Sequence, residues 1–188
     1  MAARVADLPS MDQERARYET HENDPADPRY RSFLDRLATP LAERLEPGAE
    51  GLDVGSGPGP ALSQMLTERG FPTAIWDPFF APDPAPLVRR WDFVTCSETV
   101  EHFHDPAGGW ARLFDLVQPG GWLGVMTEPI PDGAPHPLEI DSLAAWWYAR
   151  DPTHVALHRD RTFGWLAHRY GAELFRPSRS VALFRASE

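Results

Sequence analysis

The chain has 188 residues, of which 42% are hydrophobic and 24% charged, the balance of one folded domain rather than a disordered chain. No apolar run approaches the roughly 18 residues of a membrane helix. No signal-peptide pattern opens the chain, so we expect a cytoplasmic protein. The formal charge of −10 disfavours a nucleic-acid partner. The single cysteine, Cys96, excludes an internal disulfide and any CxxC motif.

The N-terminal quarter of the chain is polar up to Pro28 and carries a helical pattern of apolar residues after it. Residues 1–27 are polar and contain two Asp-Pro pairs, which predicts an irregular segment. Residues 28–45 predict a helix that begins at Pro28, and Pro40 is expected to kink or divide it. Apolar side chains recur at helical spacing along this stretch: Phe33, Leu34, Leu37, Leu41 and Leu45.

Strand and helix patterns alternate over the rest of the chain. Strands are predicted over 51–57, 73–77, 92–98, 122–128, 172–177 and 180–186. Helices are predicted over 61–69, 107–117, 141–150 and 161–171. The last two strands are too close for a parallel crossover and are expected to form an antiparallel hairpin. This order predicts a single α/β domain over residues 1–188, with a doubly wound, Rossmann-like, mostly parallel sheet.

A glycine-rich loop, LDVGSGPGP, is the most informative segment. Gly55, Gly57 and Gly59 follow a strand and precede a helix, where the chain turns tightly and a ligand can approach the backbone. Asp77 ends the next strand, eighteen residues after Gly59. A carboxylate at that place can accept the hydroxyl groups of a ribose. Phe79 follows it and can stack on an adenine.

Four segments in this order resemble the class I S-adenosylmethionine-dependent methyltransferases. They are LDVGSGPGP, the strand-end Asp77, DFVTCSETVEH and LVQPGGWLGVMTE. The resemblance implies that S-adenosylmethionine is bound by Gly55, Gly57, Gly59 and Asp77, and that Ser97 lies beside the sulfonium.

One departure from the family concerns the segment between Asp77 and Asp92. Only fourteen residues separate them, and three prolines lie within 81–86. A crossover helix plus a strand requires a dozen or more residues before turns are counted. The usual third strand is therefore expected to be missing, which leaves six.

An acidic and histidine cluster, Glu98-Thr-Val-Glu101-His102, follows the strand over 92–98. Its two carboxylates and imidazole can act as a general base or bind a divalent cation. An ExxEH motif followed by a distant histidine resembles two metal-assisted branches, the ubiquinone-pathway O-methyltransferases and the small-RNA 3′-terminal 2′-O-methyltransferases. Here that histidine is His154, and the ligands would suit Mg²⁺, Mn²⁺, Fe²⁺ or Zn²⁺.

Two further segments are expected to complete the site. In the N-terminal part, over 1–47, the HxN pattern of His21 and Asn23 resembles the entrance segment of the quinone-type enzymes. That resemblance implies that Arg29 or Arg31 meets the methionine carboxylate, and we assign Arg31. Residues 129–160 are expected to form a substrate-recognition insertion, whose Trp-Trp-Tyr run over 146–148 can border a planar acceptor.

The sequence thus predicts a methyltransferase that O-methylates a small catechol-like or vicinal-diol acceptor, with Glu98, Glu101 and His102 as catalytic residues. Two alternatives remain open. One is a metal-independent methyltransferase of a protein or RNA, and the other is a cofactor-binding regulatory protein without turnover.

Overall fold

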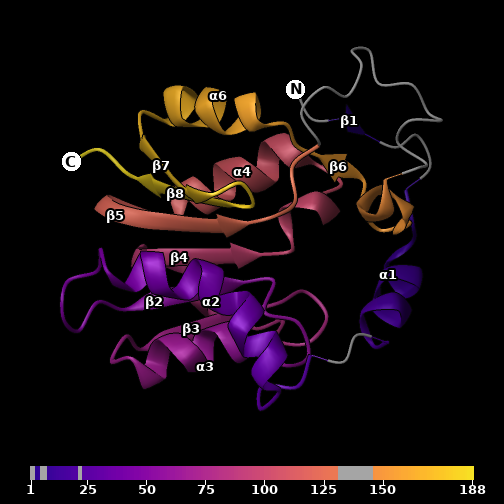
Figure 1. The fold of residues 1–188 in the computed structure, drawn as a ribbon, viewed down its shortest axis with the longest axis horizontal. Helices are drawn as coiled ribbons and strands as arrows, with labels where there is room; N and C mark the ends of the chain where they lie inside the picture. The colour runs from indigo at the N-terminus through magenta and orange to yellow at the C-terminus, as the bar shows by residue number, and fades with distance from the viewer. Residues whose placement is uncertain (1–2, 5–7, 21–22, 131–145) are drawn as a thin grey trace.

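A six-stranded mixed sheet forms the centre of the molecule (Figure 1). The computed structural model describes residues 3–4, 8–20, 23–130 and 146–188. The strand order is β3-β2-β4-β5-β8-β7. The parallel strands are β2 (Gly51–Val54), β3 (Thr73–Trp76), β4 (Trp91–Ser97) and β5 (Val117–Met126). β8 (Val181–Arg185) pairs antiparallel with β5 and with β7 (Glu173–Ser178), so the predicted α/β sheet and its terminal hairpin are confirmed.

Helices cover both faces of the sheet. α2 (Pro28–Ala42) and α3 (Ala61–Glu68) pack on one face, and α4 (Pro106–Asp115) and α6 (Asp160–Tyr170) pack on the other (Figure 1). β4 contributes side chains to the cores on both faces of the sheet. Phe93 faces α2 and α3, whereas Val94 and Cys96 belong to the opposite core, and all three are fully buried. A strand buried on both faces is expected to be mainly apolar, and the buried exception in β4, Thr95, donates a hydrogen bond to Asp53 at 2.7 Å.

The connection between β3 and β4 contains an isolated β-bridge between Asp77 and Ala81 and a short 3₁₀ helix, η1 (Ala85–Val88), but no further strand of the sheet. The expected loss of the usual third strand is therefore confirmed, and β3 is the edge of the sheet within the described residues. Proline lacks a backbone donor and fixes φ, so the proline-rich connection is poorly suited to pairing with β3.

The prediction of an irregular segment over 1–27 was wrong in part. α1 (Met11–Tyr18) forms there, and β1 (Ala3–Arg4) pairs antiparallel with β6 (Ala156–Leu157). A capping box at Ser10 and Gln13 begins α1. The helix lacks an apolar stripe, because Glu14 is its one buried residue, and hydrophobic periodicity therefore could not reveal it.

Three smaller expectations also need correction. Pro40 does not divide α2, which continues to Ala42; the proline removes only the hydrogen bond that this position would donate to the carbonyl of Arg36. β5 begins at Val117 rather than at Trp122, with a register shift opposite Trp91. The first half of the helix predicted over 141–150 falls outside the described residues, and its described end is a 3₁₀ helix, η3 (Trp147–Arg150).

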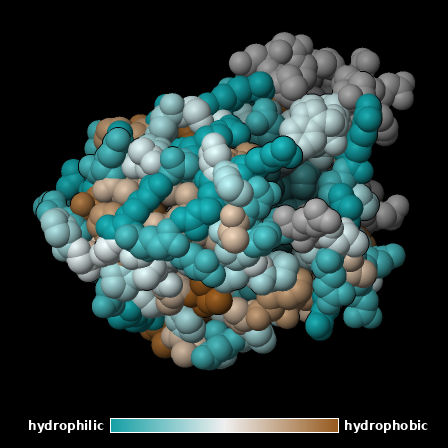
Figure 2. Space-filling view, turned by 60° about the horizontal axis from the view of Figure 1, so that its bottom comes forward, coloured by the Kyte–Doolittle hydropathy of each residue, from teal (hydrophilic) through white to brown (hydrophobic). Residues whose placement is uncertain are grey.

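The described helices contain none that is long and apolar enough to cross a membrane. The face toward α2 and α3 is mainly hydrophilic, with hydrophobic surface in small separate patches (Figure 2). Two large apolar side chains are nevertheless exposed beside the cavity described below: Met11 (64%) and Trp147 (67%).

The buried His158 makes the stability of the fold depend on pH. Its Nε2 accepts a hydrogen bond from the Trp110 indole at 3.1 Å, and burial lowers its pKa to about 4. Between that value and the usual 6.5, the unfolded chain binds a proton that the folded chain does not. The free energy of unfolding is therefore expected to decrease by about 2 kcal/mol from this group between pH 7.5 and pH 5.

Urea unfolding of the wild-type protein and of His158→Gln at both pH values measures this effect. Glutamine keeps an acceptor for Trp110 but does not titrate, so the variant should lack the decrease. Parallel pH dependence of the two proteins would contradict the assignment.

Candidate active site

A cavity of about 660 Å³ opens at the carboxyl ends of β2, β3 and β4. Its walls come from the glycine loop, from the segment after β3, from the end of β4, from α1 and α2, and from the residues after Trp146. Doubly wound sheets bind ligands at this edge. The predicted residues that line the cavity are Gly55, Gly57, Asp77, Phe79, Ser97, Glu98, His102 and His154.

The glycine loop has a backbone that other residues rarely adopt. Gly55 and Gly57 have φ values of 76° and 64°, in the left-handed region. A Cβ atom on Gly55 would lie 2.3 Å from Thr99 Cγ2. Gly59 does not line the cavity, and its Cβ would lie 1.9 Å from the carbonyl oxygen of Asn23. The first two glycines therefore shape the cavity wall, and the third admits the crossing N-terminal segment.

Asp77 ties the loop to the segment after β3. Its Oδ2 accepts a hydrogen bond from the Gly57 amide at 2.9 Å, and its Oδ1 accepts from the amides of Phe79 and Phe80 at 2.8 and 3.0 Å. A carboxylate offers about four acceptor sites. One site on Oδ2 remains for a ligand hydroxyl, and the side chain faces the cavity.

Two serine hydroxyl groups on the cavity wall can form hydrogen bonds with a polar ligand. The Oγ atoms of Ser56 and Ser97 are buried, line the cavity and have no hydrogen-bond partner among the described residues. A buried hydroxyl without a partner is costly, and a ligand that accepts or donates there would satisfy it.

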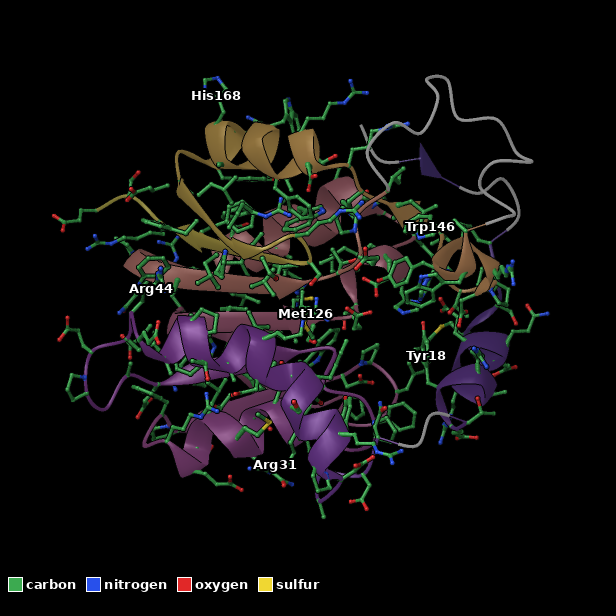
Figure 3. All side chains as sticks on the ribbon, viewed as in Figure 1. Tyr18, Arg31, Arg44, Met126, Trp146 and His168 are labelled. Carbon is green, nitrogen blue, oxygen red and sulfur yellow. The ribbon has the colours of Figure 1, made fainter. Side chains whose placement is uncertain are left out.

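The structure does not bring Arg31 to this cavity. Its guanidinium donates to Glu68 and to the carbonyl of Pro25, and Arg31 lies on the far side of α2 near α3 (Figure 3). Arg29, the other candidate, is exposed and does not line the cavity either. Both arginines lie on α2, where the ion pair with Glu68 of α3 holds Arg31 away from the cavity. His21 lies outside the described residues.

The acidic cluster lies at the end of β4, where Glu101 is buried and Glu98 and His102 are partly buried. Glu98 has a φ of 48°. This left-handed backbone conformation is energetically unfavourable for a residue other than glycine. Glu101 is completely buried, and both of its oxygens accept hydrogen bonds. Oε1 accepts from the Tyr148 hydroxyl at 2.6 Å, and Oε2 accepts from the Thr127 hydroxyl at 2.9 Å.

Burial controls the charge of this cluster. Desolvation raises the pKa of both Glu98 and Glu101, and the charge of Glu101 raises the pKa of Glu98 further. The charge of His154 lowers the pKa of Glu101. Burial also lowers the pKa of His154, which favours its neutral form. Perturbed pairs of this kind are typical of catalytic sites.

The two predicted histidines meet Glu101 in space. One ligand atom from each of Glu101, His102 and His154 lies within 4.8 Å of the others. The Nδ1 atoms of His102 and His154 each face a backbone carbonyl, at 2.9 and 2.7 Å, and must therefore carry the proton. An imidazole that carries its proton on Nδ1 binds a metal through Nε2. Glu98, predicted as a fourth ligand, is not part of this group and lines the cavity instead.

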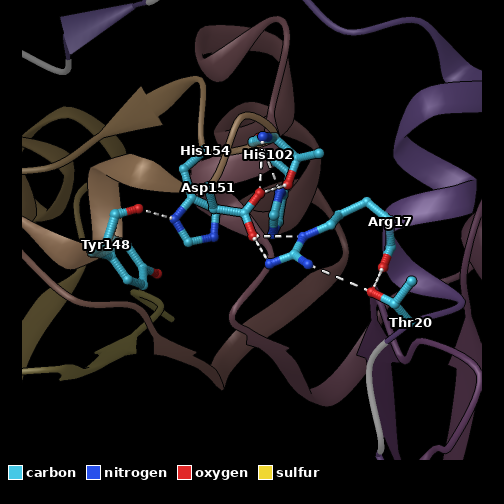
Figure 4. Close-up of polar contacts among 7 residues, drawn as sticks. Arg17, Thr20, His102, Tyr148, Asp151 and His154 are labelled. Atoms are coloured by element: carbon cyan, nitrogen blue, oxygen red, sulfur yellow. Dashed lines mark hydrogen bonds and ion pairs between the residues drawn. The ribbon is translucent and has the colours of Figure 1, made fainter. Parts of the chain in front are cut away.

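α1 contacts the residues beside this cluster through one ion pair and one hydrogen bond. Arg17 donates two hydrogen bonds to Asp151 Oδ2, at 3.0 and 2.8 Å (Figure 4). His104 Nε2 lies 3.0 Å from Glu14 Oε1. Sequence analysis missed Glu14, and the capping box at Ser10 was the signal that could have found its helix.

The comparisons with known proteins agree with this geometry. Residues 22–176 match a family model described as "Methyltransferase domain". The chain therefore belongs to this methyltransferase family.

Two curated relatives match parts of the chain. Each is named ubiquinone biosynthesis O-methyltransferase. The protein from Proteus mirabilis is 36% identical over 76 residues, which are 39% of this chain and 31% of the relative. The protein from Leptothrix cholodnii is 50% identical over 38 residues, which are 20% of this chain and 16% of the relative. The matched stretches thus span less than a third of these relatives.

Solved structures show the same fold. The 1,6-didemethyltoxoflavin-N1-methyltransferase from Burkholderia thailandensis, with its substrate and S-adenosylhomocysteine bound, has a TM-score of 0.62 at 16% identity. The alignment covers 100% of this chain and 95% of that one. An O-methyltransferase family protein from the same organism has a TM-score of 0.58 at 17% identity, covering 94% of this chain and 63% of that one.

Proposed function

We propose that this methyltransferase methylates a hydroxyl group of a small catechol-like or vicinal-diol acceptor and that a divalent cation assists the reaction. The observation that carries the proposal is the group of three ligand atoms, from Glu101, His102 and His154, within 4.8 Å of one another, with both histidines on the cavity wall. One carboxylate and two imidazoles suit Mn²⁺, Fe²⁺ or Zn²⁺ in particular. A cation with three protein ligands has coordination positions left for two neighbouring substrate oxygens.

The cavity supports a small acceptor beside the cofactor. We assign the ribose of S-adenosylmethionine to Asp77, the methionine portion to the backbone of Gly55 and Gly57, and the adenine to Phe79. Ser97 is assigned to the neighbourhood of the sulfonium. The opposite wall holds Trp147 and Tyr148, whose rings can border a planar acceptor. The net charge of −10 disfavours RNA as the acceptor.

In the proposed reaction the acceptor oxygen attacks the methyl carbon in line with the carbon–sulfur bond, which breaks to leave a neutral thioether. The hydroxyl proton passes to a carboxylate of the acidic cluster, and Glu98 is placed on the cavity wall to take it. The cavity walls orient the two reactants. A cation held by Glu101, His102 and His154 would supply charge that lowers the pKa of the acceptor hydroxyl.

Removal of the cation tests the proposal. We expect dialysis against a strong chelator to abolish methyl transfer from labelled S-adenosylmethionine to a panel of catechols, and added Mn²⁺ or Mg²⁺ to restore it. Monohydroxylated counterparts of the same acceptors should react far more slowly. Turnover that survives chelation would instead favour a metal-independent reaction in which Glu98 or Glu101 acts as the general base.

Direct measurement of Mn²⁺ binding tests the cation site with a matched control variant. Calorimetry should show that His154→Ala loses most of the affinity for Mn²⁺. The same change at His168, which is exposed on α6 (Figure 3), should leave the affinity unchanged.

A further inference from the structure

The segment over 148–154 contacts every residue of the proposed cation site. The Tyr148 hydroxyl donates to Glu101 Oε1 at 2.6 Å. The Tyr148 carbonyl accepts from His154 Nδ1 at 2.7 Å (Figure 4), and the carbonyl of Thr153 accepts from His102 Nδ1 at 2.9 Å. Hydrogen bonds of this kind fix the orientation and tautomer of metal-binding side chains.

Tyr148 differs from the other residues of the segment because it acts on two ligands through two different groups. Its phenol reaches Glu101 from η3, and its backbone reaches His154 six residues later. Its ring also packs on the His154 imidazole, with ring centroids 4.2 Å apart. The side chain is 2% exposed, so it has little freedom to leave this position.

The segment is itself held from both sides. Asp151 Oδ1 accepts hydrogen bonds from the amide and hydroxyl of Thr153 at 3.0 and 2.6 Å. Asp151 Oδ2 accepts the two bonds from Arg17 on α1. Tyr148 is therefore supported by a hydrogen-bonded turn and not by an open loop.

We propose that Tyr148 is a positioning residue that aligns Glu101 and His154 for cation binding. The proposal rests on the proposed function, because it gives Glu101 and His154 the role of ligands. Thr127 donates to the other oxygen of Glu101, and its hydroxyl lies 3.1 Å from that of Tyr148. Removing either hydroxyl should leave Glu101 in place but free to rotate.

The test is Mn²⁺ binding to Tyr148→Phe, measured by calorimetry and by the electron paramagnetic resonance signal of free Mn²⁺. We expect affinity about 10- to 100-fold below wild type, the usual cost of losing a hydrogen-bond partner of a metal ligand. Affinity for S-adenosylhomocysteine should stay unchanged, which shows that the variant is folded. Tyr170→Phe, the same change on a ring that stacks on Phe114 away from the cavity, should match wild type in both.

A double-mutant cycle adds a second measurement. Thr127→Val should also weaken Mn²⁺ binding, and the double variant with Tyr148→Phe should be non-additive because both hydroxyls act on one carboxylate. If wild type binds Mn²⁺ and Tyr148→Phe binds it equally well, the positioning role is wrong while the proposed function stands. If wild type does not bind Mn²⁺, the cation site and this inference are overturned together.

Discussion

Replacing Asp77 by alanine is expected to weaken the binding of S-adenosylhomocysteine by about 10- to 150-fold. The lost interaction is a hydrogen bond from a ribose hydroxyl to the free acceptor site on Oδ2. Hydrogen bonds to charged groups contribute about 1.5–3 kcal/mol, which corresponds to this range of affinity. The change also removes the acceptor of three backbone amides, including that of Gly57, so the glycine loop loses part of its support. Calorimetric titration measures the affinity.

Asp83→Ala is the matched control for this variant. Asp83 also accepts from a backbone amide two residues later, that of Ala85, but it is exposed and lies outside the cavity. Its substitution should leave the affinity unchanged. An unchanged affinity in Asp77→Ala would overturn the assignment of Asp77 to the ribose.

Glu101→Gln is expected to lower turnover by roughly 10²- to 10⁴-fold, the range for a group that takes part in proton transfer. The loss follows whether Glu101 holds a cation or accepts a proton, since the amide does neither well. The folded protein should not be weakened. Glutamine has the same shape, and the hydroxyls of Tyr148 and Thr127 can each donate to or accept from it.

Measuring thermal stability together with turnover distinguishes a loss of catalysis from a loss of folding. Burial raises the pKa of Glu101, so its ionised form destabilises the fold, and this cost is absent at low pH and grows as the pH rises above the unfolded value. The thermal midpoint of Glu101→Gln should therefore equal or exceed that of wild type at pH 8. Glu50→Gln, at an exposed residue paired with Arg89 at the other end of β2, should change neither quantity. Full turnover in the Glu101 variant would remove Glu101 from the proposed chemistry.

The sheet and its ligand-binding edge could be predicted because they follow from local rules. The glycine loop marks the end of one buried strand, and Asp77 and Glu98 follow the ends of the next two. Carboxyl ends of parallel strands meet at one edge, so these residues had to lie near one another. The short connection between β3 and β4 was equally readable, because chain length alone limits what fits there.

Other parts of the site depend on contacts that no local pattern encodes. α1 has almost no apolar stripe and is held against the cavity by Arg17 and Glu14, whose partners are Asp151 and His104. Arg31 was assigned to the cavity from a short pattern, but Glu68 on α3 offers it a nearer partner. Tyr148 was expected only as part of an aromatic border. Its contact with Glu101 joins residues far apart in the sequence, and spacing cannot predict such a contact.

The reactivity of the Cys96 thiol reports global unfolding of the protein. This thiol is the only one in the sequence. It lies near the carboxyl end of the central strand β4 and is completely buried, and burial raises its pKa far above the usual value. An alkylating reagent reacts with the exposed thiolate, so modification has to wait until the central strand opens. Opening of α1 at the cavity mouth would leave β4 intact and the thiol protected. The rate of alkylation therefore reports the opening of the core alone, and a bound cofactor should slow it only as far as it stabilises the whole fold.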